Sequence, residues 1–331
     1  LKSDDESRSF LPMEMFKYVV KRILLMLLTF FIIMTLCFIL VKMLPLTNLP
    51  QDPALRDIIL ARRELMGYNK PILVQYGIFL QRVILHWDWG IGETMYSGRE
   101  VVDIFAEKLP PTILINTYSL LFSVPIGIAL GIFAALKKNK WQDHVVSTGV
   151  MILVSVPSFV YAFLVQYVLS FELNLFPFQI NSGTAWLSPS MFLSMIPASL
   201  RLSFGVIAGL TRFTRAELTE VLTGEYMLLA RAKGLTKGQA TVRHALRNAM
   251  VPILPMIIGQ FISILGGSLV IEQIFGIPGV GPLYIQAINV RDYNFFMMLS
   301  AFYTFIGLAA TILVDIIYGF IDPRIRMGSR K

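Results

Sequence analysis

The sequence predicts an all-α polytopic membrane protein with six transmembrane helices and both termini in the cytoplasm. Three observations support this fold class. Hydrophobic residues make up 55% of the 331 residues and charged residues only 15%, whereas about a quarter of the residues in a soluble domain are charged. Long uncharged runs recur, and about 20 apolar residues are enough to cross a bilayer as a helix. Lys and Arg concentrate between particular runs, which is typical of cytoplasmic loops.

A polar stretch opens the chain and a long apolar run follows it. Residues 1–12 precede the first methionine, Met13. We therefore expect residues 1–15 to form an N-terminal extension, of which 1–12 have no regular structure. Ile23–Val41 contains no charged residue and is long enough to span a membrane. Because no cleavage site of small residues follows it, we interpret residues 16–44 as an uncleaved first span rather than a signal peptide.

The segment 45–109 mixes charged and apolar residues and predicts a helical region outside the membrane. The dipeptide Asp52-Pro53 is a typical helix start, and Gly67 can end that helix. The residues that follow carry an apolar stripe at helical spacing, interrupted too often by polar residues to span. Ser97 predicts a third short helix that ends before the second span.

Residues 110–331 form the predicted transmembrane core. Five further runs are long and apolar enough to span, and the dipeptide Ser188-Pro189 marks the start of one of them. The predicted spans are 110–136, 145–171, 188–214, 249–271 and 294–314, the last continuing to about 321.

Lys and Arg set the predicted orientation. Six spans place both termini on one side, and that side carries more Lys and Arg than the other. The positive-inside rule then places the termini and the loop 215–250 in the cytoplasm and the segment 45–109 outside the cell. The same rule accounts for the net charge of +8 without nucleic acid.

The sequence does not indicate a disulfide, a metal site or an ATP-binding site. Cys37 is the only cysteine, so no disulfide within the chain is expected, and the three histidines lack metal-ligand spacing. We expect no metal site, no cofactor and no catalytic residue in this chain. No Gly-Lys dipeptide occurs, so the phosphate-binding lysine of a P-loop is absent from the sequence. If ATP powers this protein, another chain binds it.

The most informative stretch is 219–252, a charged segment between two apolar runs. Glu225 suits the first turn of a helix because a carboxylate is favourable there, and Gly234 suits the position after its end, where φ is positive. Thr236 and Gln239 form a capping box, so a second helix should start at once. The sequence thus predicts a short helix suspended between two long ones.

This stretch resembles the signature loop of ABC-importer permeases. In that loop, Glu-Ala-Ala is followed after three residues by Gly. Here Ala230 and Gly234 match the second Ala and the Gly, while Leu228 and Leu229 replace the Glu and the first Ala. With these departures, and with ARAKGL at 230–235 and RHALRNA at 243–249, the stretch resembles the branch of the family that serves oligopeptides, dipeptides and nickel. Further matching motifs follow in order from about Met15: Pro71-x3-Gln75-Tyr76, Ser155-x-Pro157-Ser158-Phe159, Thr211-Arg212-x-Thr214-Arg215, Gly266-Gly267, Glu272, Pro278-Gly279-x-Gly281, Arg291-Asp292-Tyr293 and Asp322-Pro323-Arg324.

The resemblance implies the type I importer permease fold and a place in a larger complex. The long segment after the first span looks like the first of the two permeases in such systems. The implied partners are a second homologous permease, giving a heterodimer, two ATPase subunits that bind ATP and Mg, and an external substrate-binding protein. The implied location is the bacterial cell membrane, with lipid as surroundings and no nucleic acid. The chain itself would be a non-catalytic subunit of an ATP-hydrolysing transporter.

The resemblance also implies that the short helix couples this chain to the ATPase. Arg231 and Lys233 would pair with acidic residues of that subunit, and the helix would transmit its movement. The alternative is an ordinary basic cytoplasmic loop. The residues expected at this contact are Glu225, Tyr226, Leu229, Ala230, Arg231, Ala232, Lys233, Gly234, Leu235 and Thr236.

Three charged residues in or near spans are candidates for the translocation pathway. Arg201 lies near mid-membrane, where it would meet a peptide carboxylate or pair with Glu272, Asp315 or the partner permease. Asp315 is expected to pair with Arg212 or Arg215. Glu272 should lie at the external end of the fifth span, where it would either shape an external gate or bond to the loop 276–281.

The substrate predicted from the resemblance is an oligopeptide or dipeptide. A permease for nickel or a metal chelate is the alternative within the family, although no His, Cys or Met cluster along a span favours it. A self-contained channel or an ion-coupled transporter is the alternative from another class. No internal repeat is visible in the sequence, which disfavours an inverted-repeat transporter.

Overall fold

The computed structural model describes residues 3–46, 48–181 and 185–321. Within these ranges the chain is helical and forms no strand beyond one isolated bridge, between Ile91 and Glu100. Five helices are long and apolar enough to cross a membrane, and a bent helix pair raises the number to six. This confirms the predicted all-α class, with five spans, or six if the bent pair counts as one. The motif at 322–324 lies outside the described residues.

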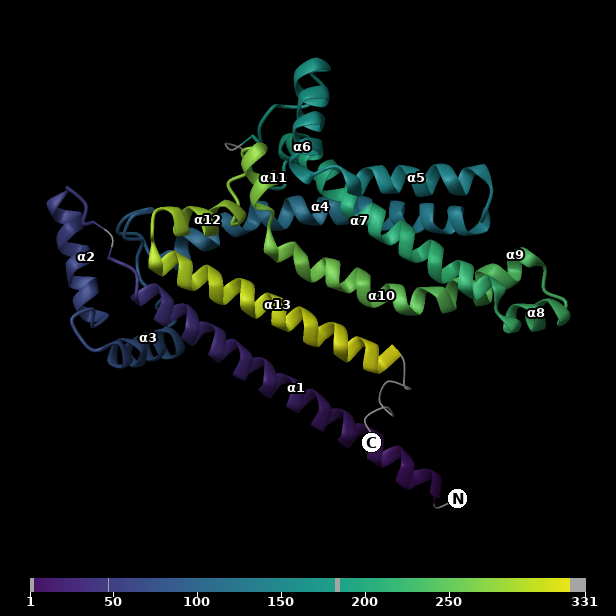
Figure 1. Ribbon diagram of the computed structural model, residues 1–331, viewed down its shortest axis with the longest axis horizontal. Helices are drawn as coiled ribbons and strands as arrows, with labels where there is room; N and C mark the ends of the chain where they lie inside the picture. The colour runs from purple at the N-terminus through teal and green to yellow at the C-terminus, as the bar shows by residue number, and fades with distance from the viewer. Residues whose placement is uncertain (1–2, 47, 182–184, 322–331) are drawn as a thin grey trace. The chain divides into compact units, whose positions relative to one another are not determined.

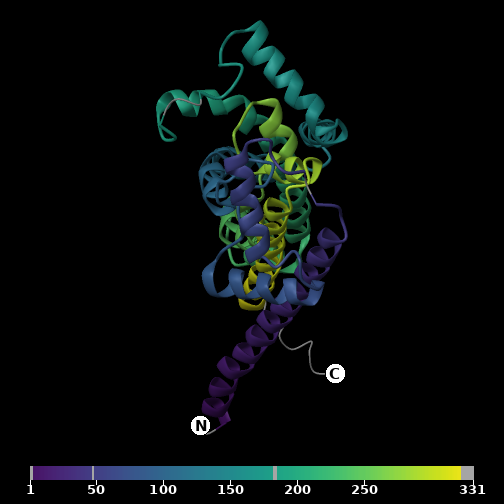
Figure 2. The ribbon, with the colours of Figure 1, turned by 90° about the vertical axis from the view of Figure 1, so that its left-hand side faces the viewer.

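The chain divides into two compact units, which are described separately. The first comprises Leu1–Leu109 with Pro282–Phe320 and the second Pro110–Gly281 with Ile321–Lys331. The first unit contains the helices α1 (Ser3–Lys42), α2 (Pro53–Leu65), α3 (Ile72–His86), α12 (Gly281–Asn289) and α13 (Tyr293–Ile321). Figure 2 shows α2 and α3 joined by the turn that follows α2.

The local helix signals of the first unit are confirmed. The Asp52 carboxylate accepts a hydrogen bond from the Ala54 N–H at 3.0 Å and caps α2. Gly67, just past the end of α2, has a φ of 69°, which glycine adopts at no steric cost. One expectation is wrong: α1 already begins at Ser3, so residues 3–12 are helical.

The helix α4 (Val101–Leu136) runs through Pro110 and Pro111 without a break. The separate short helix expected to start near Ser97 is therefore wrong, and its residues from Val101 form the first turns of a single long helix. A proline removes one intrahelical hydrogen bond and commonly kinks a helix, but neighbouring turns can carry the helix through it.

The second unit is a bundle built on α4 from Pro110 and on α7 (Pro189–Thr223). Gly127 and Gly131 let these helices approach closely: a Cβ at Gly131 would lie 2.5 Å from the Thr214 Cβ. The Thr211 hydroxyl donates to the Gly127 carbonyl at 3.1 Å. This pair of small residues thus brings two helices of the same subunit close together.

Two predicted spans are broken in the second unit. The run 145–171 forms α5 (Trp141–Ser155) and α6 (Ser158–Gln166), continued by a π-helical turn, with a bend of 99° at the intervening Pro157. Helix α5 packs against α7, while α6 turns away from the direction of α5 (Figure 1). The reason is that the residue before a proline avoids helical angles, and Val156 is extended, with ψ of 134°.

The predicted fifth span is interrupted as well. The helix α10 (Leu246–Ser263) ends in a short 3₁₀ turn, and a separate helix α11 (Leu269–Ile274) follows. Gly267 between them has a φ of 64° and a ψ of 173°, a backbone conformation that glycine adopts readily and that does not continue a helix. The expected continuous helix to Ile271 is therefore wrong. Instead, Ile271 is buried in a core cluster with Met191, Met195 and Phe275.

Candidate functional site

The predicted helix–stop–helix is present in the second unit. Helix α8 (Glu225–Ala232) begins after Gly224, and Gly234 follows its end with a φ of 91°. The Thr236 hydroxyl accepts from the Gln239 N–H at 3.3 Å, and the Gln239 side chain accepts from the Thr236 N–H at 3.1 Å. This capping box opens α9 (Lys237–Ala240) directly after the turn.

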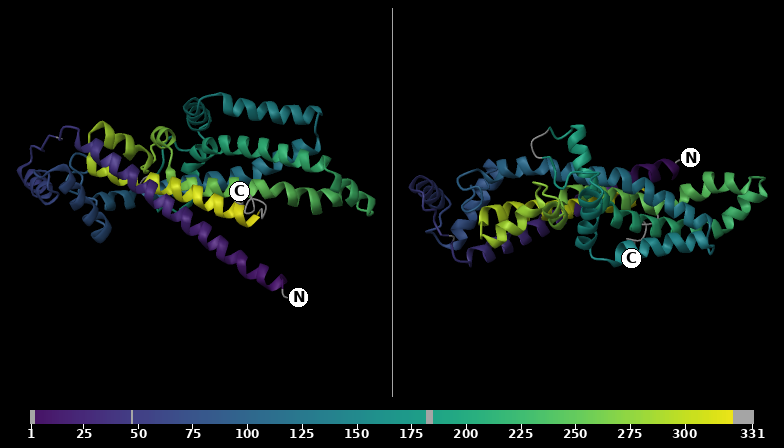
Figure 3. Two further views of the ribbon diagram at one scale, coloured as in Figure 1. Left: turned by 60° about the horizontal axis from the view of Figure 1, so that its bottom comes forward. Right: turned by 90° about the horizontal axis from the view of Figure 1, so that it is seen from above.

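The inner face of α8 rests on a layer of small side chains. Met227 and Ala230 are buried against Ala135 of α4, Leu218 of α7 and three alanines, Ala240, Ala245 and Ala249, that follow on the chain into α10. Leu235, just past the turn, packs partly buried against the same cluster. Figures 1 and 3 show α8 and α9 as a tip beyond the ends of α7 and α10.

The outer face of α8 is apolar and basic. Leu228 and Leu229 are exposed to 67% and 57%, and the side chains of Arg231 and Lys233 are also exposed. Of the residues expected at a partner contact, Glu225, Ala232, Gly234 and Thr236 are exposed as well, whereas Ala230 is buried. The Tyr226 side chain lies outside the described residues. Leu228, which the sequence prediction omitted, is the most exposed leucine of this face.

Arg201 is buried in the first half of α7, with only 8% of its surface exposed. Its Nε donates to the Ser158 carbonyl at 2.7 Å. The guanidinium carbon lies 5.7 Å from the ring centre of Tyr161 and 5.8 Å from that of Phe204. The alternative pairing with Glu272 does not occur within the second unit, because that carboxylate binds Thr112 and two backbone N–H groups.

Glu272 holds the loop that follows α11. Its carboxylate is fully buried and accepts from the Ser268 N–H at 3.1 Å, the Gly281 N–H at 2.9 Å and the Thr112 hydroxyl at 3.1 Å. Burial raises the pKa of the Glu272 carboxyl, and these hydrogen bonds lower it in part. The bond to Gly281 confirms the expectation that Glu272 bonds to the loop 276–281.

Asp315 pairs within the first unit. Its carboxylate lies 3.0 Å from the Arg22 guanidinium of α1. The expected partners were Arg212 and Arg215, and this expectation is wrong. Arg215 instead binds Asp143, at 2.5 Å from its Nε and 2.7 Å from its Nη2. Asp143 carries no local signal in the sequence, because its partner lies 72 residues away along the chain.

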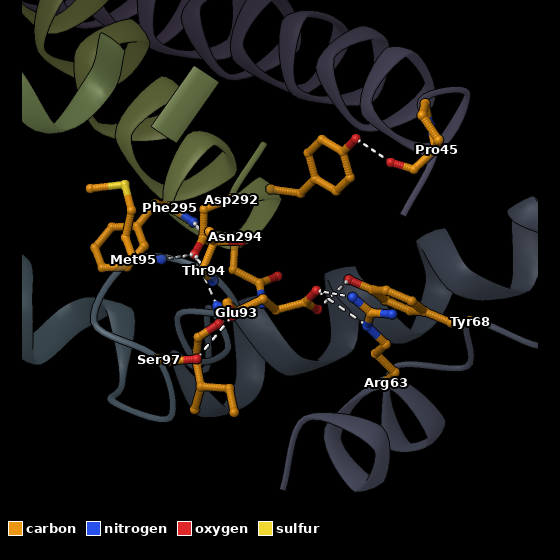
Figure 4. A network of polar contacts seen from close by, with 12 residues as sticks. Pro45, Arg63, Tyr68, Glu93, Thr94, Met95, Ser97, Asp292, Asn294 and Phe295 are labelled. Atoms are coloured by element: carbon orange, nitrogen blue, oxygen red, sulfur yellow. Dashed lines mark hydrogen bonds and ion pairs between the residues drawn. The ribbon is translucent and has the colours of Figure 1, made fainter. Parts of the chain in front are cut away.

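Asp292 is a second buried carboxylate whose structural role was not predicted from the sequence. Its Oδ2 accepts from the backbone N–H groups of Glu93, Thr94 and Met95 at 2.8–2.9 Å (Figure 4). Glu93 in turn binds the Arg63 guanidinium at 2.6 Å. Burial raises the pKa of Asp292, and the backbone N–H groups of Thr94, Met95 and Phe295 lower it in part. The sequence signal was present only as the motif Arg291-Asp292-Tyr293.

Comparison with known proteins identifies the family. Residues 127–327 match the family described as binding-protein-dependent transport system inner membrane component. The dipeptide transport system permease protein DppB of Lactococcus lactis is 33% identical over 95% of this chain and 100% of that protein. The glutathione transport system permease protein GsiC of Escherichia coli is 33% identical over 94% of this chain and 99% of that protein. A solved amino acid ABC transporter structure aligns with a TM-score of 0.48 at 20% identity, over 66% of this chain and 94% of that one.

The family match covers more than half of the chain, and the relatives match along nearly its whole length. The predicted resemblance to permeases of the peptide branch and the predicted multi-pass membrane location are confirmed. The chain belongs to the binding-protein-dependent transport system inner membrane components, the permease subunits of ABC importers.

Proposed function

We propose that this permease imports short peptides. The observation that supports this substrate class is the 33% identity to a dipeptide permease over 95% of the chain. A glutathione permease is similar to the same degree, and glutathione is itself a short peptide. Dipeptides and glutathione both carry a free carboxylate and peptide bonds, so the same polar contacts in a pathway can serve both substrates.

The proposed complex pairs this chain with a second homologous permease, two ATPase subunits and an external substrate-binding protein. ATP and Mg are bound by the ATPase subunits. The Lys and Arg distribution supports an orientation with α8 and both termini in the cytoplasm and residues 45–100 outside. Each permease then supplies half of the pathway.

The outer face of α8 is the proposed contact with the ATPase. Leu228 and Leu229 give it an apolar centre, and Arg231 and Lys233 give it a positive charge at one end. A complementary groove would have an apolar floor and an acidic rim, because charge complementarity orients such contacts. The buried Met227 and Ala230 fix α8 to the bundle, so movement of the groove reaches α4, α7 and α10.

Transport can be tested with the complete complex in liposomes. We expect uptake of radiolabelled dialanine that requires the binding protein, both permeases, the ATPases and ATP. The control omits the ATPase subunits while keeping the permeases and the binding protein. Uptake that persists without ATPase would support a self-contained channel or an ion-coupled transporter and would sink the proposal.

Gly234→Val should uncouple transport while leaving membrane insertion intact. The φ of 91° is unfavourable for a β-branched residue, at a cost of about 1–3 kcal/mol. No atom lies within 4 Å of a Cβ built at this position, so the effect comes from the backbone and not from a clash. We expect dialanine uptake and peptide-stimulated ATP hydrolysis to fall together.

Gly238 provides the matched control for this turn. A Cβ built at Gly238 would also meet no atom within 4 Å. Unlike Gly234, Gly238 lies inside a helix, α9, and its φ is not positive. Gly238→Val should therefore transport nearly as well as the wild type. Equal activity of Gly234→Val and the wild type would refute the role of the turn.

A further inference from the structure

We infer that Arg201 binds a carboxylate of the transported peptide and makes the permease selective for peptides with a free carboxylate. The inference rests on the proposed function and adds to it a residue and a chemical group. Arg201 lies about 18 Å along α7 from Pro189, at 1.5 Å per residue. That depth is more than half of a hydrocarbon core of about 30 Å, too far from the surface for a lipid phosphate.

The charge of Arg201 has no acidic partner among the described residues of its own unit, the second. Arg22 is paired with Asp315 and Arg215 with Asp143. Glu272, the other buried acid considered for this role, is occupied by Thr112 and two backbone N–H groups. A guanidinium keeps its proton in proteins, and an unpaired charge inside a membrane is costly. An anion from outside this set of residues would offset that cost.

The side chain is held so that one end of the guanidinium is available. Nε is bonded to the Ser158 carbonyl, and the rings of Tyr161 and Phe204 flank the group. The two Nη atoms have no hydrogen-bond partner among the described residues, and they are not among the enclosed polar atoms. Such a pair of parallel donors matches the two oxygens of a carboxylate, which it can bind in bidentate fashion.

The bend at Pro157 is what places the Ser158 carbonyl beside α7. Because α5 and α6 meet at 99°, the first turn of α6 comes within hydrogen-bond distance of Arg201. Tyr161, from the same turn, is itself fixed by its hydroxyl bond to the Ile152 carbonyl at 2.8 Å. Ser158 and Tyr161 of the broken helix, with Phe204 of α7, thus hold one cation in a fixed and partly aromatic setting.

The test compares two probes in the reconstituted complex: dialanine and dialanine amide, which lacks the carboxylate. Both are used at concentrations that saturate the binding protein. The binding protein is the same in every sample, so a changed ratio between the probes reports on the permease. For Arg201→Gln we expect dialanine uptake to fall at least about tenfold, the loss expected for a hydrogen-bonded charge, and amide uptake to stay unchanged.

Two further variants make the result specific. Arg212→Gln removes a positive charge from the same helix at an exposed position and should keep the wild-type ratio. Arg201→Lys keeps the charge but loses the Nε bond and the parallel donors. It should retain part of the preference for dialanine even if Arg201→Gln assembles poorly.

The outcomes separate this inference from the proposed function. An equal fall for both probes in Arg201→Gln, with wild-type transport intact, would assign Arg201 a structural role or a contact with the second permease and overturn the inference alone. An unchanged ratio in both Arg201 variants would also overturn it. A wild-type complex that imports neither probe would overturn the proposed function and the inference with it.

Discussion

Asp292→Ala is expected to destabilise the first unit by about 3–5 kcal/mol, the range for removing one partner of a buried charged network. Three backbone N–H groups, of Glu93, Thr94 and Met95, would lose their shared acceptor. Each buried donor left unpaired adds its own desolvation penalty. Thermal unfolding of the purified protein in detergent, followed by limited proteolysis between residues 88 and 100, measures the effect.

Asp52→Ala is the matched control for this prediction. Asp52 also accepts a backbone N–H, but it accepts only one of them in an exposed helix cap. Its loss should cost only about 1 kcal/mol. If Asp292→Ala is no more destabilising than Asp52→Ala, the three-donor arrangement contributes little and the prediction is wrong.

The second large effect is expected for Glu272→Ala in the second unit. The fully buried carboxylate joins α4, the turn at Ser268 and the loop ending at Gly281. Its removal should release this loop and reduce dialanine uptake at least tenfold, since about 1.4 kcal/mol corresponds to a factor of ten and three bonds are lost. Uptake and thermal unfolding would be measured on the same preparation.

A double-mutant cycle with Gly279 tests the contact directly. A Cβ at Gly279 would overlap the Glu272 carboxylate and the Thr112 hydroxyl, so Gly279→Ala should be strongly destabilising by itself. In the Glu272→Ala background part of that space is free, and Gly279→Ala should cost less. Strictly additive losses would show that the two residues do not share this space.

Features governed by neighbouring residues could be predicted from the sequence. The Asp52 cap, the Ser188 cap and the capping box of Thr236 each depend on residues two or three positions apart, and all three are present. Gly234 was predicted to have a positive φ for the same reason. Local hydrogen bonding decides these positions before any tertiary contact forms.

Features that depend on distant partners could not be predicted. Pro157 breaks a span whereas Pro110 and Pro111 do not, and the residue type is the same in each case. The partners of Asp143 and Asp292 lie 72 and about 200 residues away. The sequence shows which residues are charged, but only packing determines which charges meet, and this is why the pairing of Asp315 was wrong.

The alanine layer beneath α8 has a mechanical consequence. Alanine has no side-chain torsion, so a surface of Ala135, Ala240, Ala245 and Ala249 cannot yield by changing rotamers when α8 is displaced. Rotamer changes that would absorb a small movement are therefore limited to the longer members of the cluster, such as Met227 of α8 and Leu218 of α7. The more of the contact is alanine, the lower its compliance, and the larger the share of a displacement of α8 that is delivered to the helix ends.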